Sequence, residues 1–276
     1  NRMGGSNASG IIVDPTNGEV RALVGSADYN NEKWGKVNMV TTARQTGSSF
    51  KPIYYANALA DGTITPATVF DDKVKDFGGG YVPRDADRRE TSRGKASVRQ
   101  ALNWSLNIPS VEVMQKYGIS KSISAAKKLG ITTLSDNTSG YGLSLALGSA
   151  EIPLVEMANA YAAFANNGQQ YDVTMVSEIN NKFGKQIFAR EHKGRQAISQ
   201  QGAYLISNVL SDAATRARIF GSSITVPGNR TVAVKTGTTN DNRDAWAIGY
   251  NPQYVVGVWV GNNDNTVMRS GGSDMA

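Results

Sequence analysis

Strand-forming runs stand at both ends of this 276-residue chain, and helical patterns fill its middle. Residues 9–14 and 19–24 are rich in β-branched and aliphatic side chains, and the turn sequence at 15–18 (PTNG) predicts a hairpin. The other end of the chain has further strand patterns at residues 231–235, 245–250 and 254–260. If the two ends pair, these strands form one sheet. We therefore predict an α+β fold, with an antiparallel sheet built from both chain ends and a helical subdomain packed on it.

The middle of the chain contains amphipathic and apolar helical patterns interrupted by loops. Residues 152–166 are almost wholly apolar, which predicts a central buried helix. Residues 63–97 are rich in Gly, Pro, Asp and Arg and predict an irregular surface excursion. Residues 105–109 predict a break between two helices, and residues 176–189 predict a second hairpin. The other expected helices span residues 48–61, 98–104, 111–116, 122–129 and 200–210.

Composition excludes several classes of chemistry. The chain has no cysteine, so disulfides and thiol catalysis are excluded. Its only histidine, His192, lies in a polar run and is expected at the surface, which disfavours a Ser-His-Asp triad and a transition-metal site. Lys and Arg outnumber Asp and Glu by 29 to 23, which suits an anionic neighbour such as lipid or cell-wall polymer. The basic stretch at 84–99 is interleaved with acids and predicts a solvated loop, so no nucleic acid, metal or cofactor is expected.

Both ends of the chain are small and polar. We expect residues 1–8 to be a linker remnant, residues 9–269 a single domain, and residues 270–276 a C-terminal tail. No apolar run approaches 20 residues, so no membrane span is expected in this sequence. The interpretation is a domain cut from a longer protein whose missing part can include an anchor.

A serine and a lysine three residues apart open the first apolar helix. Residues three apart share a helix face, so the Lys51 amine is expected to reach the Ser48 hydroxyl. The helix N-terminus adds partial positive charge beside that hydroxyl, which favours a serine nucleophile with a lysine base. The same spacing recurs at Ser92 and Lys95, but Gly94 lies inside it and no helix begins there. Ser49 stands only two residues from Lys51, so Ser48 is the predicted nucleophile.

Two further motifs complete an acyl-transfer site. A Ser-x-Asn triplet occurs at Ser105 and Asn107 and again at Ser135, and a turn between packed helices positions side chains better than a polar loop, which favours Ser105. We expect Ser105 to relay a proton and Asn107 to bind a substrate peptide group. Burial and a nearby Lys235 are both expected to lower the pKa of Lys51.

The unique Lys-Thr-Gly sequence is expected on an edge strand. There Lys235, Thr236 and Thr238 would bind a substrate carboxylate, and Gly237 would allow close approach of the substrate backbone. The backbone N–H groups of Ser48 and Thr238 would form an oxyanion hole. Each motif alone is weak, because a serine at a helix start is usually a cap. Their order and contexts together favour a catalytic site.

Longer segments around these motifs resemble the transpeptidase domain of class A penicillin-binding proteins. The resemblance covers nearly the whole chain, and S-x-x-K, S-D-N and K-T-G motifs are the signature of class A β-lactamases and penicillin-binding proteins. It departs at Thr46, where the family often has proline, and at Ala247, where it often has an aromatic residue. The matching segments are residues 13–19 (VDPTNGE), 44–52 (RQTGSSFKP), 104–111 (WSLNIPSV), 144–148 (SLALG), 235–246 (KTGTTNDNRDAW) and 258–261 (VWVG).

The resemblance implies a penicillin-binding, serine β-lactamase-like fold and a D,D-transpeptidase that cross-links peptidoglycan stem peptides. Ser48 would attack the penultimate D-alanine carbonyl, and β-lactam antibiotics would acylate the same serine. Family members typically carry a membrane anchor and a glycosyltransferase domain before this one. The resemblance therefore implies a place on the extracellular face of the bacterial cytoplasmic membrane.

Three alternatives stay open. A D,D-carboxypeptidase would use water as the acceptor. A serine β-lactamase would need an added carboxylate, for which the segments at Glu151 and Glu156 are only partial matches to the usual Glu-x-x-Leu-Asn. A non-enzymatic β-lactam sensor would be acylated once, although such sensors resemble a different branch.

Overall fold

The two chain ends do combine into one sheet. A computed structural model describes residues 3–86, 94–222, 224 and 230–271. In it, five antiparallel strands follow the order β11-β12-β13-β1-β2, so the N-terminal hairpin joins the C-terminal strands where β1 pairs with β13. This confirms the predicted α+β architecture. The strands are β1 (Asn7–Val13), β2 (Val20–Val24), β11 (Ala233–Thr238), β12 (Asp244–Tyr250) and β13 (Val255–Gly261).

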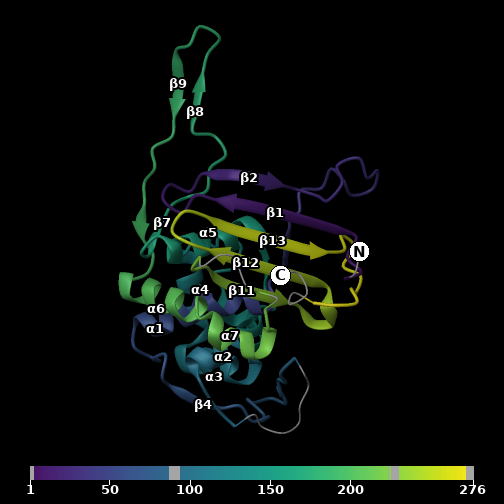
Figure 1. Cartoon of the computed structure of the whole chain (residues 1–276), viewed down its shortest axis with the longest axis vertical. Helices are drawn as coiled ribbons and strands as arrows, with labels where there is room; N and C mark the ends of the chain where they lie inside the picture. The colour runs from purple at the N-terminus through teal and green to yellow at the C-terminus, as the bar shows by residue number, and fades with distance from the viewer. Residues whose placement is uncertain (1–2, 87–93, 223, 225–229, 272–276) are drawn as a thin grey trace.

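The apolar helix α5 (Leu154–Ala165) packs against the sheet, as its composition predicts. It contacts β1, β12 and β13, and the Tyr161 ring meets the Tyr250 ring edge-on. Figure 1 shows the other helices gathered on the β11 side of the molecule. None of the helices in the described ranges is long and apolar enough to span a membrane. The remaining α-helices are α1 (Lys51–Ala60), α2 (Val98–Asn103), α3 (Asn107–Tyr117), α4 (Ile119–Lys128), α6 (Gln200–Leu210) and α7 (Ala213–Phe220), and the 3₁₀ turns are η1 (Gly47–Phe50), η2 (Thr138–Gly140), η3 (Leu143–Leu147) and η4 (Asn240–Asn242).

The first helix begins later than the sequence predicts. Ser48 lies in η1, and the α-helix starts only at Lys51. Pro52 explains the boundary, because it has no N–H to donate to the Ser48 carbonyl in an α-helical bond. The carbonyl instead accepts from the Lys51 N–H, three residues on, which is a 3₁₀ bond.

The break between α2 and α3 is shorter than predicted. It comprises only residues 104–106, and Pro109 lies inside the first turn of α3. A proline is tolerated there because the N–H groups of a first helical turn have no partner within the helix. The break is thus a tight turn that presents Ser105 between two helices.

Residues 63–97 run over the surface, but part of this excursion is anchored. Short strands β4 (Val69–Asp71) and β5 (Lys95–Ser97) pair at its base. Asp85, predicted on a solvated loop, is instead buried, with 8% of its surface exposed. Its Oδ1 atom accepts the backbone N–H of Asn107. Ser92, the serine of the second S-x-x-K spacing, lies outside the described residues.

Three further strand pairs complete the fold. β3 (Ala43–Gln45) pairs with β6 (Glu151–Pro153), so Ile152 belongs to a strand and not to the predicted helix. β7 (Gln169–Gln170) pairs with β10 (Arg195–Gln196). The predicted hairpin forms from β8 (Glu178–Asn180) and β9 (Gln186–Ala189), and Figure 1 shows it projecting away from the body on the β2 side.

Candidate active site

Two adjacent serines in η1 have different surroundings. The Ser49 hydroxyl is buried and donates to the Thr46 carbonyl at 2.7 Å, while the Ser49 carbonyl accepts from the Tyr161 hydroxyl at 2.7 Å. Ser48 is half-buried, and within the described residues its hydroxyl makes no hydrogen bond. Of these two serines, only Ser48 therefore has a hydroxyl that is free to react.

Lys51 is fully buried and its amine has three acceptors. Nζ donates to the Ser105 carbonyl at 2.8 Å, to the Leu106 carbonyl at 3.0 Å and to Asn107 Oδ1 at 2.8 Å. Three acceptors match the three N–H bonds of an ammonium. The sequence predicts that Lys51 reaches Ser48, but no Lys51–Ser48 hydrogen bond forms in this arrangement. The amine points instead at the turn between α2 and α3.

Burial lowers the pKa of Lys51 to about 7, against the opposing negative charges of Asp85 and Asp72. Removing an ammonium from water disfavours its charged form, so at neutral pH a large fraction of the amine is free base. The pKa of Lys235 is also lowered, first by burial and then by the charges of Lys51 and Arg216. The repulsion expected between the two lysines thus lowers the pKa of Lys235. Burial is the main cause of the lowered pKa of Lys51.

Ser105 lies between the two lysines. Its carbonyl accepts from Lys51, and its hydroxyl accepts from Lys235 Nζ at 2.9 Å. Its φ of 59° is in the left-handed region, which is costly for a residue with a Cβ and recurs at functional sites. The turn therefore brings Ser105 into contact with α1 through its carbonyl and with β11 through its hydroxyl.

β11 is an edge strand of the sheet, as predicted, and it approaches η1 very closely. A Cβ on Gly237 would overlap the Thr46 carbonyl oxygen, and a Cβ on Gly47 would overlap the Thr238 carbonyl oxygen. Gly47 also has φ +53°, which favours glycine. The two glycines allow the backbones that carry Ser48 and Thr238 to lie side by side. Thr236 is buried in the same strand, and Thr238 at its end is half-buried.

Asn107, the first residue of α3, is held on three sides. Oδ1 accepts from Lys51, Nδ2 donates to the Arg84 carbonyl at 2.8 Å, and the backbone N–H donates to Asp85 Oδ1 at 2.5 Å. These contacts fix the orientation of the amide group. They also connect the surface excursion to the centre of the site.

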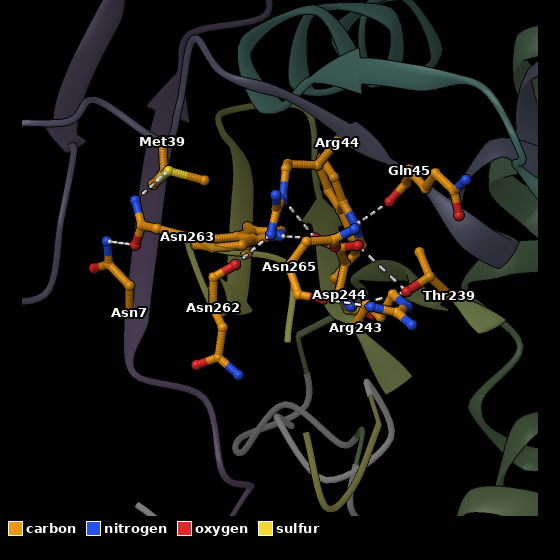
Figure 2. A network of polar contacts seen from close by, with 12 residues as sticks. Asn7, Met39, Arg44, Gln45, Thr239, Arg243, Asp244, Asn262, Asn263 and Asn265 are labelled. Atoms are coloured by element: carbon orange, nitrogen blue, oxygen red, sulfur yellow. Dashed lines mark hydrogen bonds and ion pairs between the residues drawn. The ribbon is translucent and has the colours of Figure 1, made fainter. Parts of the chain in front are cut away.

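A buried ion pair anchors the segments that precede Ser48 and follow Thr238. Arg44 Nε donates to Asp244 Oδ1 at 2.9 Å, and both side chains are largely buried. Asp244 also accepts from Trp259 Nε1 at 2.9 Å, and its backbone N–H donates to Thr239 Oγ1 at 2.8 Å. Figure 2 shows Arg44 reaching Asp244, with Thr239 beside it. A second tie runs from Trp246 Nε1 to the Gln45 carbonyl at 2.8 Å.

The structure separates the competing residues from this cluster. Ser135 and Asn137 are exposed, and the Ser135 hydroxyl accepts from the Asn137 N–H within their own loop. His192 is exposed as predicted and contacts the Asn17 carbonyl. The Glu156 carboxylate accepts four hydrogen bonds from Thr132 and Thr133, so it is committed to another loop.

Sequence reasoning missed Asp85, Arg44 and Asp244 as contributors to this site. Acidic residues in a charged, glycine-rich stretch usually indicate a solvent-exposed loop. Nothing in the sequence places Asp85 against Asn107. Arg44 and Asp244 do fall inside the segments that carry the family resemblance. Their pairing across 200 residues becomes visible only in the fold.

Comparisons with known proteins agree with this geometry. A family model described as the penicillin binding protein transpeptidase domain matches residues 8–276. The chain is similar to Penicillin-binding protein 1C of Escherichia coli K12, with 36% identity over 95% of this chain and 32% of the relative. It is similar to Penicillin-binding protein 1A of Neisseria meningitidis serogroup A, with 31% identity over 91% of this chain and 32% of the relative. The chain thus spans about a third of the length of these relatives.

A solved structure gives the same match in three dimensions. The PonA1 protein from Mycobacterium tuberculosis, determined in complex with penicillin V, superposes with a TM-score of 0.84. Its sequence is 27% identical, and the match covers 96% of this chain and 73% of that chain.

Proposed function

Since the chain belongs to the penicillin-binding protein transpeptidase family, we propose that it is a serine D,D-transpeptidase that cross-links peptidoglycan stem peptides through an acyl-enzyme on Ser48. The same serine is the proposed target of β-lactam antibiotics. The observation that carries the proposal is the buried Lys51 amine, whose pKa is lowered to about 7 and which is tied to the turn that carries Ser105. A lysine in that state can be a base at neutral pH.

The first chemical step is proton removal from Ser48. As a neutral amine, Lys51 has two N–H bonds and one lone pair, so it releases one of its three acceptors and can turn the lone pair toward Ser48. The Ser48 oxygen attacks the penultimate D-alanine carbonyl, and its proton passes to Lys51. The negative charge that develops on the carbonyl oxygen is stabilised by the backbone N–H groups of Ser48 and Thr238.

Collapse of the tetrahedral intermediate breaks the peptide C–N bond. The leaving D-alanine amine takes a proton from the Ser105 hydroxyl. The proton that Lys51 took from Ser48 replaces it on the Ser105 oxygen, while Lys235 Nζ keeps its hydrogen bond to that oxygen. The terminal D-alanine departs and an ester remains on Ser48. The amine of a neighbouring stem peptide then attacks the ester, which forms the cross-link and returns the proton to Ser48.

Lys235, Thr236 and Thr238 are proposed to bind the substrate carboxylate along β11. Gly237 lets the substrate backbone approach that edge closely. The free N–H of the Asn107 amide, the one not bound to the Arg84 carbonyl, is available to a substrate peptide group. This arrangement holds the scissile carbonyl between β11 and the turn at Ser105.

The rival reactions differ in their acceptor. A β-lactamase needs a carboxylate that activates water, and Glu156, one of the two partial matches, already accepts hydrogen bonds from Thr132 and Thr133. A D,D-carboxypeptidase uses the same acylation machinery with water. Supplying a stem-peptide mimic with and without an added amine separates the two: amide product supports the transpeptidase, and hydrolysis alone supports the carboxypeptidase.

Labelled penicillin tests the nucleophile. We expect one stable adduct on Ser48, located by mass spectrometry of a digest. An adduct on Ser92 or Ser49, no adduct, or rapid turnover would contradict the proposal. Ser49→Ala is the matched control and should still form the adduct on Ser48.

The parent protein is a further part of the proposal. The relatives named above are about three times as long as this chain, which spans 32% of each. A glycosyltransferase domain and a membrane anchor would fit in that additional length and would place the domain on the extracellular face of the cytoplasmic membrane. Fractionation of cells that express the full-length product tests this: recovery without membranes would contradict it.

A further inference from the structure

Asp85 meets the site from a segment that is remote in sequence. It belongs to the excursion between β4 and β5, yet it is buried and its Oδ1 atom accepts the backbone N–H of Asn107. The residue before it, Arg84, accepts from the Asn107 side chain through its carbonyl. Arg84 and Asp85, two consecutive residues of the excursion, therefore hold Asn107. The Oδ1 atom of Asn107 in turn accepts from Lys51.

The contact also completes the start of α3. Leu106 stands at the N-cap position and provides no side-chain cap, and the first turn of α3 contains no acid. A helix N-terminus has unpaired N–H groups and partial positive charge, both of which a carboxylate satisfies. Asp85 provides that carboxylate from another part of the chain. The turn at residues 105–107, which carries all three acceptors of Lys51, is thus fixed from its far side.

The charges around Lys51 have opposite signs. Asp85 and Asp72 face it from the excursion, and both are buried. Lys235 of β11 lies on the other side of Ser105 and donates to its hydroxyl. The positive charge of Arg216 in α7 helps to lower the pKa of Lys235. Of the two acids, Asp85 has the larger effect on Lys51 and makes the contact with Asn107.

We propose that Asp85 is a positioning residue for the reaction: its carboxylate fixes Asn107, and through it the Lys51 amine, while its negative charge stabilises the ammonium form of that amine. This rests on the proposed role of Lys51 as the base. Without Asp85, the ammonium would lose the larger of its two compensating charges from the described acids, Asp85 and Asp72, and the base would be neutral at lower pH. Asp85 therefore raises the pH at which the site becomes reactive, against the larger opposite effect of burial.

Asp85→Asn separates the two parts of the role. Asparagine keeps an oxygen that accepts the Asn107 N–H but removes the charge. We expect the midpoint of Lys51 titration to fall by about one pH unit, the effect of one nearby carboxylate on a buried amine. Asp85→Ser, which keeps a smaller acceptor, is the second variant and should shift the midpoint in the same direction. Asp76→Asn is the matched control, because Asp76 is an exposed acid of the same excursion.

Two measurements decide the proposal independently. The first is the ¹³Cε shift of Lys51 against pH in labelled protein, assigned with Lys51→Met, which needs no substrate. The second is the rate of penicillin acylation against pH, whose acidic limb should move to lower pH in Asp85→Asn. Midpoints that stay at the wild-type value, rise, or shift equally in Asp76→Asn would overturn the proposal. If wild type forms no adduct on Ser48, the proposed function fails, and the ¹³C titration still decides the role of Asp85.

Discussion

Lys235 Nζ and Ser105 Oγ are joined by a hydrogen bond of 2.9 Å across 130 residues of sequence. Ser105 takes a left-handed backbone conformation at the turn between α2 and α3, with φ 59°. The same turn presents the Ser105 carbonyl to Lys51. One strained residue thus connects both lysines, which is consistent with strain stored where a function requires it.

Replacing Ser105 separates this strain from the chemistry. Ser105→Gly suits a positive φ and removes the hydroxyl, whereas Ser105→Ala removes the hydroxyl and keeps the unfavourable conformation. We expect both variants to be acylated by penicillin roughly 100-fold more slowly, the size of a proton-transfer contribution. Ser105→Gly should melt at a higher temperature than Ser105→Ala. Acylation at the wild-type rate in either variant would remove Ser105 from the proton relay.

The pKa of Lys51 predicts how acylation depends on pH. Only the neutral amine accepts the Ser48 proton, and its fraction grows as pH rises through about 7. The acylation rate should therefore rise about tenfold per pH unit below that value and level off above it. Stopped-flow measurement with a fluorescent penicillin gives the profile. Lys51→Arg, which stays charged, should abolish acylation at every pH, and a flat wild-type profile would contradict the assignment of Lys51 as the base.

Gly237 tests the close approach of β11 to η1. In Gly237→Ala the new methyl group would overlap the Thr46 carbonyl, so β11 or η1 must shift. We expect a loss of stability of roughly 1–3 kcal/mol and slower acylation, because Thr238 moves away from Ser48. Gly249→Ala on β12 is the matched control, since its methyl group would have only ordinary contacts, the nearest at 3.6 Å from Val232. Thermal unfolding and acylation of the two variants should differ clearly, and equal behaviour would mean that the Gly237 contact is unimportant.

Much of the site follows from the sequence because its residues lie in short motifs with local structural meaning. Ser48 and Lys51 share a turn by spacing alone, and the tight turn between two helices favours Ser105 over Ser135. The sheet follows from strands at both ends. These features depend on local propensity and on the pairing of strands into a sheet. Both can be recognised from the pattern of residues in the sequence.

What the sequence conceals is long-range pairing. Asp85 lies in a stretch whose composition predicts a solvated loop, and only the fold brings it to Asn107. The boundary at Lys51 depends on one missing N–H at Pro52, and Ile152 joins a strand because β3 lies beside it. Helix α7 has eight residues and no strong pattern, so tertiary contacts such as Trp104 Nε1 to the Thr215 carbonyl define it.

The Arg44–Asp244 ion pair should be important for stability. Asp244→Ala would leave the buried Arg44 guanidinium without its carboxylate and Trp259 Nε1 without an acceptor. Removing one partner of a buried pair costs about 3–5 kcal/mol, so we expect a large drop in the denaturant midpoint. Asp172→Ala is the control, because its pair with Arg195 is exposed and should contribute little. Similar midpoints for both variants would mean that the buried pair does not anchor the Ser48 turn.

The lowered pKa of Lys51 also predicts how the stability of the fold depends on pH. Its pKa is about 7 in the folded protein and near 10.5 in the unfolded chain, so between these values the unfolded state binds more protons. Stability should therefore increase with pH in that window, by roughly 1.4 kcal/mol per pH unit for this group alone. Lys51→Met removes the titration, and the difference in unfolding free energy between wild type and variant should rise with pH across the window and be constant below it. A difference that is independent of pH, measured by chemical denaturation, would show that Lys51 keeps an ordinary pKa in the folded protein.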